Sequence, residues 1–242
     1  MKILLLSKDA VFLADTAQKK FQTQYGEINL EKVRIGKKIK STKGKEFIVA
    51  APTLIDLLKK AKRGPQIITP KDAGAIAAIT GVTSGWRCLD AGSGSGFLAL
   101  FLGNLVRPNG NVYTYEKKKE NYEIVKKNIV HCGLEETVTV KNADALKGFK
   151  EKNLDLITLD MQFAEKLAKR AHNALKPGGW LCVYSPHIEQ QIKAVKAMEK
   201  EGFVHMKTVE TIQREWKVSH GFSHPRHSQV VHTGFITTGR KI

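Results

Sequence analysis

A run of alternating small residues, Asp90-Ala-Gly-Ser-Gly-Ser-Gly96, is the first segment of this sequence that could do chemistry. Its glycines permit a tight turn and let a ligand approach bare backbone. Asp90 can accept hydrogen bonds from the turn or from a cationic amino-acid ligand. The spacing does not suit a dinucleotide, because the sixth position counted from Gly92 is Phe97 rather than glycine. Alone, the run indicates only a glycine-rich binding turn.

Three further acids follow the run at intervals that suit a nucleoside. Glu116 comes about 20 residues after the loop, where a carboxylate can accept hydrogen bonds from both hydroxyls of a ribose. Asp144 is placed to reach an adenine amino group, and Asp160 ends another apolar segment. Any one of these acids could equally cap a helix or lie solvated in a loop. Together with the glycine run, they predict an adenosyl site.

Short apolar segments precede these acids, and strands there would position them. We expect strands at 86–90, 112–116, 138–142, 154–159 and 180–184. Helices are expected over 70–79 up to Gly81, around 122–129 up to Gly133, and over 187–201. This alternation predicts a parallel sheet with an α/β, Rossmann-like architecture. Terminal strands at 206–216 and 228–237, joined by the basic stretch 217–227, would complete a mixed seven-stranded sheet with a terminal hairpin.

The first quarter of the chain follows a different pattern. Residues 1–64 lack a long helical pattern and alternate apolar with polar residues, as at 32–35, 38–40 and 46–49. We therefore expect a small β-rich domain at 1–64, followed by the larger α/β domain at 65–242.

The charge balance points to a polyanionic partner. The 242 residues include 40 Lys and Arg against 23 Asp and Glu, a formal net charge of +17. Such a field attracts nucleic acid, although a lysine-rich solvated surface is the simpler alternative. No apolar run approaches the roughly 18 residues of a membrane span, and the opening Leu4-Leu-Leu6 meets Ser7 and Lys8 too early for a secretory signal. We expect a cytoplasmic protein with no membrane partner.

A metal site is not expected. Cys88, Cys132 and Cys182 are far apart, without ligand-like spacing. His220 and His224 are four residues apart, but the intervening glycine and the proline that follows argue against the helix that this spacing needs as a zinc site. These histidines, with the neighbouring Arg226, are better suited to contact phosphate or a subunit interface.

Two sets of motifs carry a resemblance to known families. The glycine run, the three later acids and Lys176-Pro-Gly-Gly179 resemble the class I methyltransferases, which share one S-adenosylmethionine pocket. The segment Lys62-Arg-Gly-Pro-Gln-Ile-Ile-Thr-Pro-Lys-Asp-Ala-Gly74 resembles the linker of the tRNA (adenine-N1) methyltransferase family. Gly44-Lys-Glu-Phe47, Pro52-Thr-Leu54, Arg214-Glu-Trp-Lys-Val218 and His232-Thr-Gly-Phe235 are similar to other parts of that family. The resemblance spans nearly the whole chain.

This resemblance implies a homotetrameric enzyme that methylates N1 of the T-loop adenosine of tRNA, adenine-58, and uses its small N-terminal domain to hold tRNA. It implies S-adenosylmethionine as cofactor and Asp160 as catalytic residue. The cofactor contacts that it implies are Gln66, Asp90, Gly92, Ser93, Gly94, Ser95, Gly96, Phe97, Glu116, Lys117, Asp144, Ala145 and Asp160. Adenine N1 has an in-plane lone pair that can attack the methyl group directly, and a carboxylate at Asp160 would stabilise the positive charge that develops on the base.

Two positions depart from the family pattern. Thr69 stands where the family usually has tyrosine, and Met161-Gln162 follows Asp160 where the family usually has x-Pro. A different target base, or a tRNA-binding paralogue without catalysis, therefore stays open. A third alternative is a small-molecule methyltransferase, for example one acting on a tetrapyrrole precursor, which the charge and the N-terminal domain disfavour.

Overall fold

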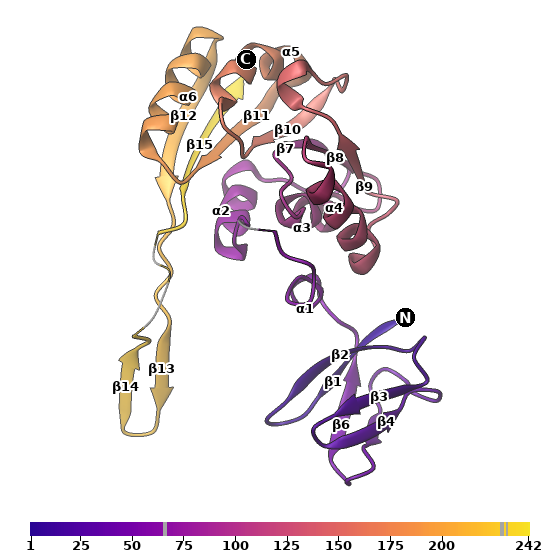
Figure 1. Ribbon diagram of the computed structural model, residues 1–242. Coiled ribbons are helices and arrows are strands. Elements are labelled where there is room, and N and C mark those ends of the chain that lie inside the picture. Colours follow the sequence, from indigo (N-terminus) through magenta and orange to yellow (C-terminus); the bar gives the residue numbers. More distant parts are fainter. Residues whose placement is uncertain (65–66, 228–229, 231) are drawn as a thin grey trace. The chain divides into compact units, whose positions relative to one another are not determined.

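The computed structural model describes residues 1–64, 67–227, 230 and 232–242. These residues form two compact units, Met1–Ala61 and Lys62–Ile242, which we describe one at a time (Figure 1). The division lies slightly before the boundary between residues 64 and 65 that the sequence indicated.

The first unit is a small antiparallel β-structure. One sheet has the strand order β2-β1-β6-β5, and β3 pairs with β4 as a separate hairpin. The bounds are β1 (Lys2–Leu6), β2 (Val11–Asp15), β3 (Lys20–Thr23), β4 (Gly26–Asn29), β5 (Lys38–Lys40) and β6 (Glu46–Ala50). Alternate residues such as Ile3 and Leu5 point into a core that also holds Phe47 and Val49.

The strand expected at 32–35 is absent, and that prediction was wrong. Residues 32–35 lie in turns and irregular backbone between β4 and β5, and Ile35 is half exposed while Val33 packs on the core. The alternation of apolar and polar residues at 32–35 therefore reflects one side chain, Val33, that packs on the core, and not a paired strand. The unit also contains the short helix α1 (Leu54–Leu58), which Thr53 and Asp56 cap reciprocally.

The second unit is built on a mixed seven-stranded sheet with the order β12-β15-β11-β10-β7-β8-β9. All neighbouring strands pair in parallel except β15, which runs antiparallel to both β11 and β12. The bounds are β7 (Arg87–Ala91), β8 (Asn111–Glu116), β9 (Val138–Asn142), β10 (Leu154–Leu159), β11 (Leu175–Ser185), β12 (Phe203–Glu210) and β15 (Phe235–Lys241). The predicted parallel sheet and the five strands expected in it, β7 to β11, are confirmed.

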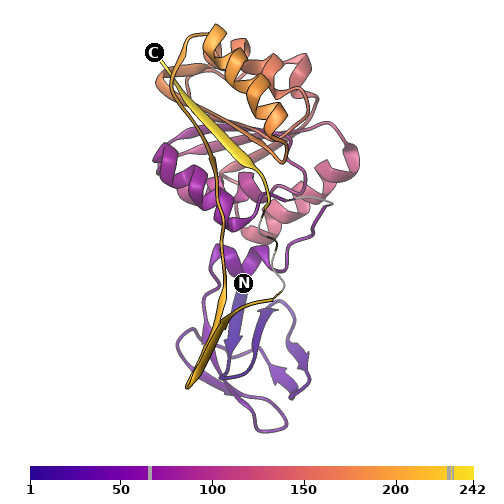
Figure 2. The ribbon, with the colours of Figure 1, turned by 90° about the vertical axis from the view of Figure 1, so that its left-hand side faces the viewer.

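Helices cover both faces of this sheet, with α6 on one face and α2 and α3 on the other (Figure 2). The bounds are α2 (Pro70–Thr80), α3 (Phe97–Val106), α4 (Lys119–Cys132), α5 (Ala168–Ala174) and α6 (Ile188–Lys200), with 3-10 turns η1 (Ala145–Lys147) and η2 (Ala164–Leu167). Gly81 and Gly133 end α2 and α4 in the left-handed conformation, as their positions predicted. No helix among the described residues has the length and apolar character of a membrane span.

The two terminal strands differ from the prediction in their bounds. The first begins at Phe203 and ends at Glu210, and the second begins at Phe235, not near residue 228. Residues 228, 229 and 231 lie outside the described residues. The expected basic connection instead contains a second hairpin, β13 (Trp216–Ser219) and β14 (Phe222–Pro225), which turns at Gly221. The lysine and the histidines of this hairpin obscured the alternation of apolar and polar residues that would have indicated its strands.

Candidate active site

The glycine run lies between the end of β7 and the start of α3, at the carboxyl edge of the sheet. Gly92 has φ +94°, and a Cβ atom there would lie only 1.9 Å from the carbonyl oxygen of Asp160. Gly96 has φ +84°, and its Cβ would lie 3.0 Å from a methyl group of Val125. Both positions therefore require glycine, one because β10 ends beside the loop and the other because α4 packs on it.

Asp90 fixes the position of the loop through hydrogen bonds to neighbouring strands. Its carboxylate is buried and accepts hydrogen bonds from the hydroxyls of Thr114, at 2.8 Å, and Thr158, at 2.7 Å. These partners lie on the neighbouring strands β8 and β10, rather than in the turn. Burial raises the pKa of Asp90, partly offset by these two hydrogen bonds.

Glu116 ends β8 and already binds backbone. One carboxylate oxygen accepts a hydrogen bond from Gly94 N at 3.0 Å, and the other accepts one from Lys118 N at 2.8 Å. The side chain is only 6% exposed, so it holds the glycine run in place. Each carboxylate oxygen has a second lone pair, which leaves acceptor capacity for ribose hydroxyls.

Asp144 caps a short turn. Its carboxylate accepts a hydrogen bond from Leu146 N at 3.0 Å, at the start of η1. The neighbouring Ala145 and Lys117 line a small cavity, together with Gly92, Tyr115, Ala143, Met161 and Gln162. The capping alternative weighed for Asp144 therefore applies, and its neighbours form the cavity wall.

Asp160 directly follows β10 and lines two cavities. No hydrogen bond to its side chain is present among the residues that the structure describes, and Phe163, not Asp160, is the cap residue of η2. Burial, with a smaller contribution from the Asp90 carboxylate, raises the pKa of Asp160 to about 7. An unpartnered carboxyl group at a cavity is available to a ligand.

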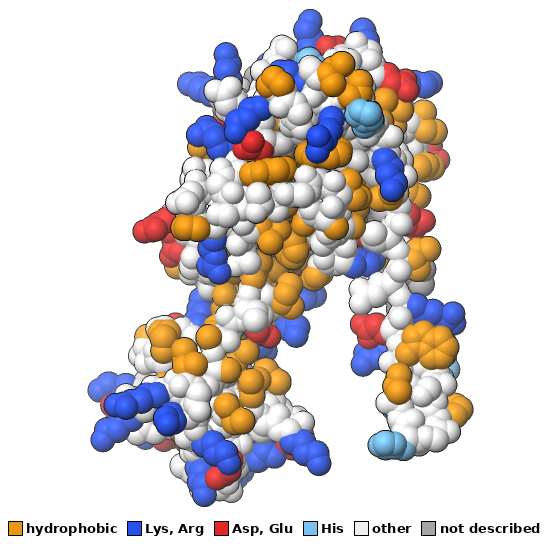
Figure 3. Space-filling view, turned by 180° about the vertical axis from the view of Figure 1, so that it is seen from behind, with side chains coloured by type: hydrophobic (Ala, Val, Ile, Leu, Met, Phe, Trp, Pro, Cys, Tyr) orange, Lys and Arg blue, Asp and Glu red, His pale blue; other side chains and the backbone are white. Residues whose placement is uncertain are grey.

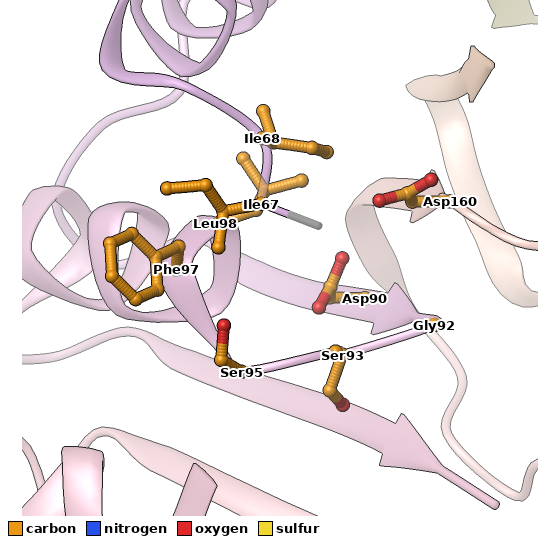
Figure 4. Close-up of a pocket in the computed structure, with 10 residues that line it drawn as sticks. Ile67, Ile68, Asp90, Gly92, Ser93, Ser95, Phe97, Leu98 and Asp160 are labelled. Carbon is orange, nitrogen blue, oxygen red and sulfur yellow. The ribbon is translucent and has the colours of Figure 1, made fainter. Parts of the chain in front are cut away.

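The narrower cavity combines an apolar wall with two carboxyl groups. Figure 4 shows Ile67, Ile68 and Leu98 on one side and Asp90 and Asp160 on the other. The other lining residues are Gly92, Ser93, Gly94, Ser95 and Phe97, so most of the glycine-run residues expected in the site meet here. Gly96 does not line this cavity and is the N-cap residue of α3, and Gln66 lies outside the described residues.

One buried polar atom in this cavity lacks a partner. Ser95 is 1% exposed, and its hydroxyl has no hydrogen bond within the described part of the protein. A buried hydroxyl of this kind is usually satisfied by a ligand or by water. The bare backbone at Gly92 and the free hydroxyl of Ser95 therefore fit a polar nucleoside ligand.

A wider cleft of about 470 Å³ adjoins Asp160. Gly92, Gly94, Glu116, Lys117 and Asp160, which the sequence predicted as site residues, all line this cleft. The sequence did not predict the other lining residues Lys118, Asn121, Tyr184, Pro186, His187 and Gln190. Several of these follow β11 at the same edge of the sheet as the predicted acids. The rule that ligands bind beyond the carboxyl ends of parallel strands would have found them. Met161 and Gln162 also line this cleft.

The histidines and cysteines form no metal site among the described residues. The three cysteines are buried, and no disulfide joins them in the described part of the chain. His232 instead bonds to Glu210, whose carboxylate raises the pKa of the imidazole.

Replacing Gly92 with alanine should abolish tight nucleoside binding, because the new methyl group would force the loop away from Asp160. We expect at least a tenfold weaker dissociation constant for S-adenosylmethionine, measured by calorimetry. Gly74→Ala is the matched control, because a Cβ at that position in α2 meets no atom within 4 Å. An unchanged affinity in Gly92→Ala would remove the loop from the site.

The second unit has a mostly parallel sheet with one antiparallel strand. A glycine turn follows β7, and an acidic residue stands at or just after the end of each of the next three strands in the sequence. Together these features define a Rossmann-like methyltransferase architecture. A family profile described as tRNA methyltransferase complex GCD14 subunit matches residues 48–230. The TrmI protein of Methanocaldococcus jannaschii, named a tRNA (adenine(57)-N(1)/adenine(58)-N(1))-methyltransferase, is 32% identical over 99% of this chain and 94% of its own length.

Two solved structures are similar over the whole chain. An S-adenosylmethionine-dependent O-methyltransferase of Thermotoga maritima has a TM-score of 0.85 and 32% identity, with 92% of that chain covered. The tRNA (m1A58) methyltransferase TrmI of Aquifex aeolicus has a TM-score of 0.80 and 26% identity, with 97% covered. This chain belongs to the tRNA methyltransferase family that the profile describes.

Proposed function

We propose that this enzyme transfers a methyl group from S-adenosylmethionine to N1 of adenosine 58 in the T loop of tRNA. The observation that carries the proposal is the carboxyl group of Asp160, which has no hydrogen-bond partner among the described residues and lines both the glycine-run cavity and the wider cleft. Membership of a tRNA methyltransferase family supports the substrate. Among the described residues, no feature favours the noncatalytic alternative.

The glycine-run cavity would hold the cofactor. Glu116 would accept hydrogen bonds from the ribose, Ser95 would bond to a polar group of the ligand, and Ala145 and Lys117 would contact the adenine. Asp90 would act mainly by fixing the turn, since both its oxygens bond to neighbouring strands. When bound, the cofactor supplies an electrophilic methyl group on a sulfonium.

Asp160 would act on the acceptor base. As a carboxylate it would accept a hydrogen bond from the exocyclic amine of adenine and orient N1 toward the methyl donor. The methylated base is cationic, so this negative charge favours the product side of the reaction. The residue removes no proton from N1, because that nitrogen attacks through its own lone pair.

The methylation rate should depend on pH through Asp160. Its carboxylate form predominates only above the pKa of about 7. At limiting cofactor, kcat/KM should therefore fall about tenfold per pH unit below that value and level off above it. Rates measured from about pH 5.5 to about pH 8.5 check this. A profile that is flat across this range would show that the ionisation of Asp160 does not control the reaction.

The small N-terminal unit is proposed to contact the RNA backbone. Lys32, Arg34, Lys37 and Lys38 line a hollow of about 300 Å³ on its surface. Lys38 is paired with Glu46, which leaves the other three cations without an acidic partner among the described residues. Figure 3 shows that Lys and Arg outnumber Asp and Glu on the face it displays. Basic side chains around a hollow suit phosphate groups.

A homotetramer is proposed as well. The β13–β14 hairpin exposes Trp216, Val218 and Phe222, which are 54%, 79% and 70% exposed. Apolar side chains that lie together and exposed to water typically mark a protein–protein contact, so we expect these residues to contact another subunit. Light scattering should give four times the mass of one chain.

An enzyme that acts on tRNA is expected in the cytoplasm.

The direct test is methyl transfer itself. Bulk tRNA would be incubated with the protein and methyl-labelled S-adenosylmethionine, then digested and analysed by mass spectrometry of nucleosides. Labelled 1-methyladenosine is expected. Binding of both ligands without methyl transfer would favour the noncatalytic alternative. Label in a small molecule but not in RNA would favour a small-molecule methyltransferase.

A further inference from the structure

A buried charged cluster surrounds Asp72 and shares no residue with the lining of the cleft. Asp72, in the first turn of α2, is fully buried. Its carboxylate accepts hydrogen bonds from the hydroxyls of Thr69 at 2.9 Å, Thr233 at 2.7 Å and Thr211. The Lys71 ammonium lies 2.7 Å from the same carboxylate and also donates to the Thr211 carbonyl at 2.7 Å and the Thr233 hydroxyl at 2.6 Å.

This cluster joins three segments that are distant in the sequence. Thr211 directly follows β12, and Thr233 lies two residues before the start of β15, so both lie where the sheet continues into the segment that carries the β13–β14 hairpin. Figure 1 shows α2 beside these ends of β12 and β15. The first turn of α2 is thereby tied to both strands.

The cluster determines geometry more than it adds stability. Burial would raise the pKa of Asp72, but the hydrogen bonds from Lys71 and the three threonines outweigh burial and lower it. A buried ion pair gains little over an apolar contact of the same shape, but it demands one arrangement of its partners. Asp72 and Lys71 therefore hold these segments in a single register.

Tyr184 connects the cluster around Asp72 to the cleft. This residue lies near the end of β11, is 4% exposed and lines the same cleft as Asp160. Burial raises the pKa of its hydroxyl to about 12, and the nearby Thr233 and Asp72 side chains also influence this pKa. Its ring lies against Gly234, where a Cβ atom would be 2.5 Å from the ring carbon that carries the hydroxyl. The cluster and this glycine together fix the position of the ring.

We propose that Lys71 and Asp72 are positioning residues for methyl transfer, which act through Thr233 to hold the Tyr184 ring as a wall of the cleft that receives the acceptor base. The proposal rests on the function proposed above. It also gives Thr69 a use, because its hydroxyl supplies one of the four donors to Asp72.

A double-mutant cycle tests whether the cluster acts through the tyrosine hydroxyl. Asp72→Asn and Tyr184→Phe should each slow single-turnover methyl transfer by about tenfold, with the cofactor dissociation constant unchanged. The double variant should also be slowed about tenfold, because both changes break the same connection. Independent effects that multiply to about a hundredfold would overturn the proposal, as would a folded Asp72→Asn with the normal rate.

Two further variants guard against misfolding and unspecific loss. If Asp72→Asn does not fold, Thr233→Val replaces it in the cycle, because it removes the bridging hydroxyl while keeping the shape of the side chain. Thr208→Val is the matched control: its hydroxyl bonds to Thr237 within the same β12–β15 pair, away from the cluster, and its rate should be normal. A similar slowing in Thr208→Val would mean that any loosening of these strands has the same effect, which would overturn the proposal.

A signal that does not need activity separates this proposal from the function. In protein containing 3-fluorotyrosine, the fluorine resonance missing from Tyr184→Phe belongs to Tyr184. It should shift in Thr233→Val and stay in place in Thr208→Val. An unmoved resonance in Thr233→Val would overturn the inference. If the wild-type protein transferred no methyl group to tRNA, the proposed function would fail, and this resonance would still decide whether the cluster holds the tyrosine.

Discussion

Asp160→Asn should slow methyl transfer by about a hundredfold to a thousandfold while both ligands bind as before. The change keeps the shape of the side chain and removes the negative charge that would stabilise the methylated base. Folding should not suffer, because burial already disfavours the charged form of Asp160 and raises its pKa to about 7. Cofactor affinity should persist because it depends on the glycine run and Glu116.

Single-turnover kinetics with saturating cofactor and tRNA measure this effect. Glu165→Gln is the control, since it removes one nearby negative charge from η2 without touching the cleft residues. The control should react at the wild-type rate. If Asp160→Asn reacted at that rate too, the carboxylate would have only a structural role.

The second large effect concerns salt. If about six phosphates are neutralised, the affinity for tRNA should fall by roughly a thousandfold between about 50 and about 200 mM salt, by analogy with duplex DNA. The net charge of +17 and the cations that line the N-terminal hollow motivate this expectation. Filter binding or fluorescence anisotropy over a salt series gives the slope.

A pair of variants locates the cations that neutralise phosphate. Arg34→Gln combined with Lys37→Gln should flatten the slope by roughly one for each phosphate that is no longer neutralised. Lys20→Gln is the matched control, because Lys20 is paired with Glu27 in the same unit, 2.9 Å away. A slope near zero in the wild-type protein would contradict a polyanionic substrate and would favour a small-molecule methyltransferase.

The central sheet could be predicted because local patterns specify it. Buried parallel strands are short apolar runs, and Gly81 and Gly133 mark helix ends through a backbone conformation that other residues rarely adopt. The glycine run was predictable for the same reason. The terminal strands were not, because the sequence offers no glycine or proline where β12 ends at Glu210.

The site was predicted in part. Asp160 and Glu116 lie at the ends of strands, so their place at the sheet edge followed from the pattern. Tyr184 and the residues that begin α6 lie at the same edge, at the end of β11 and just after it, so the strand-end rule could also have placed them in the cleft. The cluster around Asp72 was out of reach, because its partners Thr211 and Thr233 lie 139 and 161 positions away in the sequence.

One pair of tRNA transcripts tests the central claim most directly. One transcript carries adenosine at position 58 and the other guanosine, and both are incubated with the protein and methyl-labelled S-adenosylmethionine. We predict labelled 1-methyladenosine, mapped to position 58, in the first transcript only. The first transcript also shows whether position 57 reacts, as the name of the Methanocaldococcus jannaschii relative suggests. Label on a ribose oxygen, equal label in both transcripts, or none in either would contradict the assignment.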